Sequence, residues 1–210
     1  MGSHSHGSGN GVSHAAGRPR SVVVVEAAPA ASDATAVAGA AAALLGQCAA
    51  IIESVDDSAY ASISSTIRGG TIGKHVRHVL DHFRAAIDGD GPGGCIDYDR
   101  RERDVPMETD RSLALSAIED LSARIGDMDG TRLAATVRVK VMVAADGCTV
   151  ELRSTLAREL AFATHHAVHH NAMVRAIAAE FGHELPEDLG KAPSTLNHER
   201  RLGGGNRTGG

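Results

Sequence analysis

The sequence is poor in aromatic residues. Its 210 residues include no tryptophan, 3 phenylalanines and 2 tyrosines. A core must therefore be built from Ala, Val, Leu and Ile, which are among the residues most often buried. Such an aliphatic mixture favours close helix packing over a surface on which sugars or bases stack.

The sequence also lacks an excess of basic residues and a pattern of paired cysteines. Lys and Arg number 21 against 26 Asp and Glu, so the formal net charge is −5. A nucleic-acid-binding protein needs a concentrated basic face, and we expect no such partner. Cys48, Cys95 and Cys148 are odd in number and form no C-x-x-C motif. This favours a reducing compartment over a disulfide framework.

Long apolar runs are missing as well. None approaches the roughly 18–20 residues that span a bilayer, so we expect no membrane partner. The valine run at residues 22–25 is ended by Glu26. It is shorter than the roughly 7–15 apolar residues of a secretory signal. We expect a cytoplasmic protein. Organellar targeting stays an alternative, because no acidic residue precedes Glu26.

The composition divides the chain into three parts. Residues 1–31 are mostly low in complexity, rich in Gly, Ser and His at the start, and predict disorder. Residues 196–210 become Gly-rich and predict a flexible tail. Residues 32–195 show no internal repeat and no second apolar core, which predicts one domain.

Four segments of this domain have helical periodicity, with apolar residues at i, i+3 or i+4 and i+7. They span about residues 33–55, 71–87, 110–125 and 155–181. Ser32 or Asp33 is placed to cap the first helix and Thr109 the third. Four such helices predict a four-helix bundle.

One segment alternates instead. Residues 136–143 alternate between polar and apolar side chains, and Asp146-Gly147 leads into a second extended segment that ends near residue 152. Alternation around an Asp-Gly turn predicts a β-hairpin. The expected fold class is therefore all-α, a four-helix bundle with a β-hairpin between helices three and four.

Histidines line one side of two predicted helices. His75, His78 and His82 fall within roughly 60° of one another at 100° per residue. On the last helix, His166 and His170 lie one turn apart, so both could bind one divalent cation.

A single helical histidine is more often a solvated or hydrogen-bonded residue than a ligand, and we apply that interpretation to His75 and His165 alone. The combined set is different. Several imidazoles in an aliphatic interior are costly unless protons or a cation satisfy them. The sequence therefore predicts a metal site between the second and fourth helices.

The same residues carry a family resemblance. The helix-two segment I-G-x-H-V-R-H at residues 72–78, followed by H-x-x-x-H at His166 and His170, resembles the DinB-like, or YfiT-like, superfamily of metalloenzymes. A Y-D-x-R-x-R-D segment at residues 98–104 and A-P-S-T at residues 192–195 resemble one of its uncharacterised branches. The similarity covers about residues 33–195.

The resemblance implies a fold and a ligand set. It implies a four-helix bundle with three histidine ligands to zinc, nickel, iron or manganese, which match His78, His166 and His170 by position. Members include transferases and isomerases that depend on low-molecular-weight thiols. The implied function is a metal-dependent small-molecule enzyme, either a hydrolase or a thiol-dependent transferase. The alternative is a non-catalytic metal-binding protein with a structural or sensing role. Homodimer formation is left open.

Other polar residues receive provisional roles. Arg101 or Arg103 is expected to hold a substrate carboxylate, since a guanidinium grips one with two parallel hydrogen bonds. Tyr98 would then donate a proton. The alternative for this charged segment is a solvated loop with internal ion pairs.

Three residues near the predicted ligands complete the candidate site. Glu159 either fixes an imidazole tautomer or is a favourable charge at a helix N-terminus. His82 and His169 are candidate bases beside the ion or replacement ligands. A fourth protein ligand, for which His82 is the best candidate, would favour the structural role.

Overall fold

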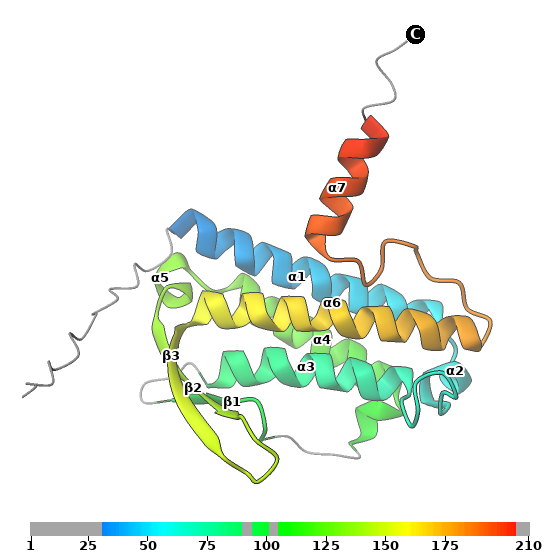
Figure 1. Cartoon of the computed structure of the whole chain (residues 1–210), viewed down its shortest axis with the longest axis horizontal. Helices are drawn as coiled ribbons and strands as arrows, with labels where there is room; N and C mark the ends of the chain where they lie inside the picture. Colours follow the sequence, from blue (N-terminus) through cyan, green and yellow to red (C-terminus); the bar gives the residue numbers. More distant parts are fainter. Residues whose placement is uncertain (1–30, 90–93, 101–104, 205–210) are drawn as a thin grey trace, which may run out of the picture.

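The computed structural model describes residues 31–89, 94–100 and 105–204. These parts are mostly helical, with a small three-stranded sheet (Figure 1). The long helices are α1 (Ala31–Ser54), α3 (Ile72–Asp88), α4 (Arg111–Gly126) and α6 (Leu156–Glu180). Helix α3 packs against α4 and α6, and α1 packs against the same two helices. The prediction of a helical fold is confirmed in this coarse sense, whereas the label all-α omits the sheet.

The long helices begin where side chains can cap them. Thr71 accepts a hydrogen bond from the Lys74 amide and so caps α3. Thr155 caps α6 in the same way, and this agrees with the helix that the sequence predicted from about residue 155. Helix α4 is capped by Asp110, and the predicted cap, Thr109, is one residue too early. Both side chains can cap a helix, so the sequence alone does not separate them.

The predicted hairpin is confirmed. Strands β2 (Thr136–Met142) and β3 (Thr149–Thr155) pair antiparallel, with Val139 opposite Leu152. Gly147 has a φ of 90°, a left-handed conformation that favours glycine in the turn. The structure adds β1 (Cys95–Asp97), which pairs parallel with β2 to give the order β1-β2-β3. This strand lies in a segment for which the sequence predicted only a charged loop.

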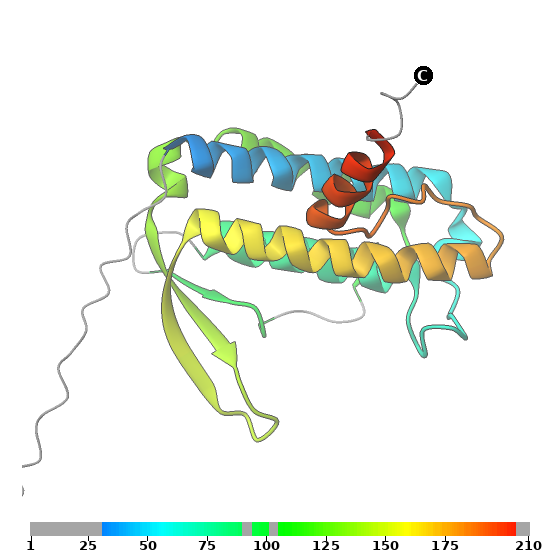
Figure 2. The same ribbon diagram turned by 45° about the horizontal axis from the view of Figure 1, so that its top comes forward.

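Shorter elements connect and extend the long helices. They are α2 (Asp57–Ala61), the 3-10 helix η1 (Pro106–Glu108), α5 (Gly130–Leu133) and α7 (Pro193–Gly204). Helix α7 projects away from the long helices in Figure 1, and in Figure 2 it lies in front of α1. It occupies most of the segment that the sequence assigned to the tail.

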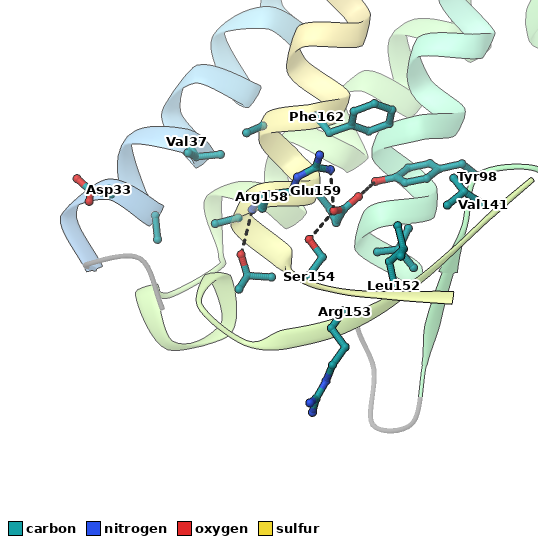
Figure 3. Close-up of a pocket in the computed structure, with 15 residues that line it drawn as sticks. Asp33, Val37, Tyr98, Val141, Leu152, Arg153, Ser154, Arg158, Glu159 and Phe162 are labelled. Carbon is teal, nitrogen blue, oxygen red and sulfur yellow. Dashed lines mark hydrogen bonds and ion pairs between the residues drawn. The ribbon is translucent and has the colours of Figure 1, made fainter. Parts of the chain in front are cut away.

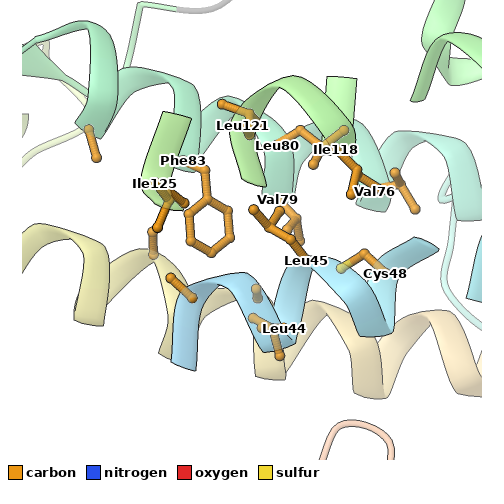
Figure 4. Packing of buried hydrophobic residues seen from close by; sticks show 14 of the residues in the cluster. Leu44, Leu45, Cys48, Val76, Val79, Leu80, Phe83, Ile118, Leu121 and Ile125 are labelled. Carbon is orange, nitrogen blue, oxygen red and sulfur yellow. The ribbon is translucent and has the colours of Figure 1, made fainter. Parts of the chain in front are cut away.

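Aliphatic side chains and one phenylalanine fill the space between the long helices (Figure 4). The buried residues labelled there are Leu44, Leu45, Cys48, Val76, Val79, Leu80, Phe83, Ile118, Leu121 and Ile125. They come from α1, α3 and α4, so the apolar stripe of α3 faces this core. The histidine side of α3 is thereby directed toward α6.

Helix α3 begins in very close contact with η1. A Cβ atom added at Gly73 would lie 2.0 Å from the carbonyl oxygen of Glu108 and 2.8 Å from the ring of Tyr60. Any larger side chain at this position would force the two elements apart, since real Cβ contacts are never so short. The glycine therefore fixes where α3 starts.

Helix α1 corrects one expectation. Its segment Asp33–Ser54 is long and apolar enough to cross a membrane by length and composition alone, although no segment was expected to be. Alanines account for this, because they raise the hydropathy without forming a run of large apolar residues. Core helices of soluble proteins pass the same test. Here one side of α1 packs on α4 and α6.

Candidate metal centre

Five histidines meet between α3 and α6. His75, His78 and His82 come from α3, and His166 and His170 come from α6. His82 and His170 are 8% and 9% exposed, so this cluster lies mostly inside the protein. His165 and His169, on the other side of α6, are exposed. The helical spacing thus separates a buried histidine stripe from a solvated one.

Nε2 of His166 lies close to two other ring nitrogens of the cluster. The Nε2 atom of His166 lies 2.9 Å from Nε2 of His78 and 3.0 Å from Nε2 of His170. A ring nitrogen carries either one proton or one lone pair, so it makes only one good hydrogen bond. Ordinary hydrogen bonding cannot satisfy both contacts. Two imidazole nitrogens on a tetrahedral zinc ion, at about 2.0–2.1 Å from it, lie about 3.3 Å apart, close to the observed separations.

His82 completes a second possible ligand set. One ligand nitrogen from each of His78, His82 and His166 lies within 4.8 Å of the other two. Nδ1 of His82 lies 2.9 Å from the carbonyl oxygen of His78. A carbonyl only accepts, so Nδ1 carries the proton and Nε2 keeps its lone pair, as a metal ligand requires. His78 and His166 are common to both sets, while the predicted third ligand was His170.

His75 extends the cluster beyond the predicted ligands. Its Nδ1 lies 2.9 Å from Nδ1 of His170. If Nε2 of His170 bound a cation, Nδ1 of His170 would carry the proton and donate it to His75. From the sequence, His75 alone was interpreted as a solvated or hydrogen-bonded residue, because helix spacing does not show a contact with the facing helix.

The surroundings of His170 and His75 lower the pKa of both and so favour their neutral forms. Burial, and then the neighbouring His166, lower the pKa of His170 to about 3. Burial, and then His169, also lower the pKa of His75. Neutral imidazoles have the lone pairs that a metal ion needs. The two causes explain why His170 is held in the form that can act as a ligand at neutral pH.

Tyr98 joins the cluster to a buried carboxylate. Its ring stacks on His82 with centroids 5.2 Å apart, and its hydroxyl donates to Glu159 over 2.8 Å. Glu159 is 2% exposed and also accepts from Ser154 and Arg158. Burial, and then Glu159, raise the pKa of Tyr98 well above its usual value. Tyr98 therefore keeps its proton, and Glu159 orients this tyrosine beside His82.

The remaining predicted residues fall elsewhere. Arg101 and Arg103 lie outside the described residues, so their predicted contact with a substrate stays a prediction. In the described part of the chain, the hydrogen-bond donors to Glu159 are Tyr98, Ser154 and Arg158, none of them a histidine. An influence of Glu159 on the imidazoles would therefore act through Tyr98.

A pocket of about 570 Å³ adjoins the cluster, between the start of α1, the sheet and the start of α6 (Figure 3). Of the described residues that line it, none is a histidine. Tyr98 and Phe162 line it and also contact the cluster, since the ring centroids of Phe162 and His166 lie 5.9 Å apart. Two aromatic rings therefore border both the pocket and the histidine cluster.

Comparison with known proteins finds a match to part of the chain. No protein-family model matches the sequence. A protein named FK506-binding protein 5, from Rhizopus delemar, is 33% identical over 107 residues. The match covers 50% of this chain and 28% of that protein. The chain thus spans little more than a quarter of this relative, and the match does not show a family.

Proposed function

We propose that this chain holds one divalent metal ion through His78, His166 and His170, with His82 as the nearest further imidazole. The observation that carries the proposal is the position of Nε2 of His166, within 3.0 Å of two other ring nitrogens. These short separations make His170 the proposed third ligand, and His82, whose ligand nitrogen lies within 4.8 Å of those of His78 and His166, is the alternative. Imidazole ligands suit zinc, nickel and iron. Manganese is the remaining ion that the family resemblance implies.

We further propose that the fold is a DinB-like four-helix bundle and that the protein is a cytoplasmic enzyme acting on a small molecule. The packing of α1, α3, α4 and α6 against one another supports the bundle. An ion with three imidazole ligands and an open position would activate water for hydrolysis or bind the thiolate of a thiol cosubstrate. Tyr98, held by Glu159, would orient His82 at the edge of this site. The adjoining pocket supports a small-molecule substrate.

The second candidate function is non-catalytic metal binding with a structural or sensing role. It is favoured by His82, because a fourth imidazole would close a tetrahedral site. The name of the Rhizopus relative does not add a third candidate. The matched segment is 28% of that protein, so FK506 binding is not extended to this chain.

Elemental analysis tests the metal site directly. The full chain should be purified with His4, His6 and His14 replaced by glutamine, so that these three histidines contribute no ligands. We expect about one divalent ion per chain, lost when His166 is replaced by alanine. A chain that binds no zinc, nickel, iron or manganese after reconstitution would refute the proposal.

Cobalt(II) separates the two functions. A thiol such as cysteine should change the visible absorption of the cobalt-substituted protein if a coordination position is open. No change with any thiol or carboxylate, combined with loss of folding on chelation, would instead support the structural role.

A further inference from the structure

We propose that the pocket beside the cluster binds a small organic carboxylate with an apolar body, and that this is the substrate class of the metal centre. The second part rests on the proposed function. Binding itself requires no metal, because no described lining residue is a histidine. The pocket volume of about 570 Å³ is within the usual range for sites of small organic molecules, about 300–1,000 Å³.

Apolar side chains from three elements form the walls. Val37 comes from α1, Val141 and Leu152 from the sheet, and Phe162 from α6 (Figure 3). Leu152 and Phe162 are large apolar residues that stay exposed, at 54% and 37%. A ligand body placed between them would remove this apolar surface from water, which is favourable.

Charged side chains that line the pocket determine which ligand charge is favoured. Asp33 and Glu159 are the carboxylates that line the pocket. Asp33 is exposed, whereas Glu159 is buried and already accepts hydrogen bonds from Tyr98, Ser154 and Arg158. Arg158 donates to Glu159 through Nη1 and lies over the ring of Phe162, with its guanidinium carbon 5.6 Å from the centroid.

The side chain of Arg158 is 65% exposed, so N–H groups remain for a second partner. A ligand carboxylate would accept from these groups, whereas an ammonium group there would face the positive guanidinium.

The two faces of β3 provide a matched control. Leu152 and Ser154 face the pocket, and Arg153 lies between them in the strand. Side chains alternate along a strand, and Figure 3 shows the Arg153 side chain pointing away from the other lining side chains. Arg153 is itself a lining residue, so its replacement removes the same charge from the same region but keeps Arg158, the donor beside Glu159.

Calorimetric titration of the chelator-treated full chain tests the pocket. The probes are octanoate, octylamine and 1-octanol, which share one apolar body. We expect octanoate to bind saturably with one site per chain and more tightly than the other two. Arg158→Gln should weaken octanoate binding about 10- to 100-fold, as expected for a hydrogen bond to a charged group. Arg153→Gln should leave the affinity unchanged.

Three results would overturn the proposal: no octanoate binding at millimolar concentration, octylamine binding as tightly as octanoate, or equal losses in Arg158→Gln and Arg153→Gln. The metal content of the same preparations keeps the two proposals apart. Protein that binds octanoate but never holds a metal ion refutes the metal function and the assignment of substrate class, while the pocket assignment stands. Protein that holds the ion but does not bind octanoate refutes only the pocket assignment.

Discussion

Alanine substitution of each clustered histidine should rank the metal ligands. Four-ligand structural zinc sites have apparent binding free energies of about 10–16 kcal/mol, so one imidazole contributes about 3 kcal/mol. This corresponds to about 100-fold in the dissociation constant. His78→Ala and His166→Ala should each cause at least this loss, because both residues belong to either ligand set.

The third ligand is decided by comparing two further variants. Nε2 of His170 lies 3.0 Å from Nε2 of His166, whereas the ligand nitrogen of His82 lies within 4.8 Å of those of His78 and His166. His170→Ala should therefore weaken zinc binding about 100-fold. His82→Ala should weaken it about 10-fold or less, the size of an effect transmitted through a neighbouring group.

Competition with a chromophoric zinc chelator at neutral pH measures these dissociation constants. The matched control is His165→Ala, which removes an exposed histidine from the same helix and should leave the affinity unchanged. Thermal unfolding of each metal-free variant shows whether a loss of affinity comes from a damaged fold. A larger effect of His82→Ala than of His170→Ala would refute the assignment of His170, and a large effect of His165→Ala would refute the register of α6.

Three further outcomes are expected. His75→Ala should weaken zinc binding about 10- to 100-fold through the loss of its contact with His170, and His75→Gln, which retains an acceptor, should restore part of it. In urea titrations of the metal-free protein, the free energy of unfolding should fall as the pH decreases from about 6.5 toward 3, by up to about 1.4 kcal/mol per pH unit. The reason is that in this range His170 binds a proton in the unfolded chain but not in the folded one. The same dependence of stability on pH in His170→Gln would contradict this. Phe83→Ala should lower the free energy of unfolding by about 3–5 kcal/mol, since the ring is fully buried, and a loss below about 1 kcal/mol would show that the core is assigned wrongly.

Local signals in the sequence were sufficient for much of the fold. Asp146-Gly147 predicted the hairpin turn, because the residues that favour such a turn are themselves in the turn. Thr155 predicted the start of α6 for the same reason. Strand β1 had no comparable signal. Only Ile96 of its three residues is buried, and its partner Val139 is far along the chain.

The candidate site shows the same division between local and long-range information. The spacing of His166 and His170 places both on one side of a helix, which the sequence alone reveals. The contact of His75 with His170 depends on how α3 and α6 pack, and no helical pattern contains that information. The stacking of Tyr98 on His82 depends in addition on β1, the strand that the sequence did not predict.

The close contact at Gly73 has a consequence for how selection acts on this chain. The glycine and His78 stand in one short motif, yet the first is needed for packing against Glu108 and the second is proposed to serve chemistry. A library of all substitutions, sorted first for soluble expression and then for metal content, should separate them. Gly73 variants should be lost at the first sort and His78 variants only at the second. Invariance at neighbouring positions of this motif would thus record two independent pressures, one on the ability to fold and one on the task of the folded protein.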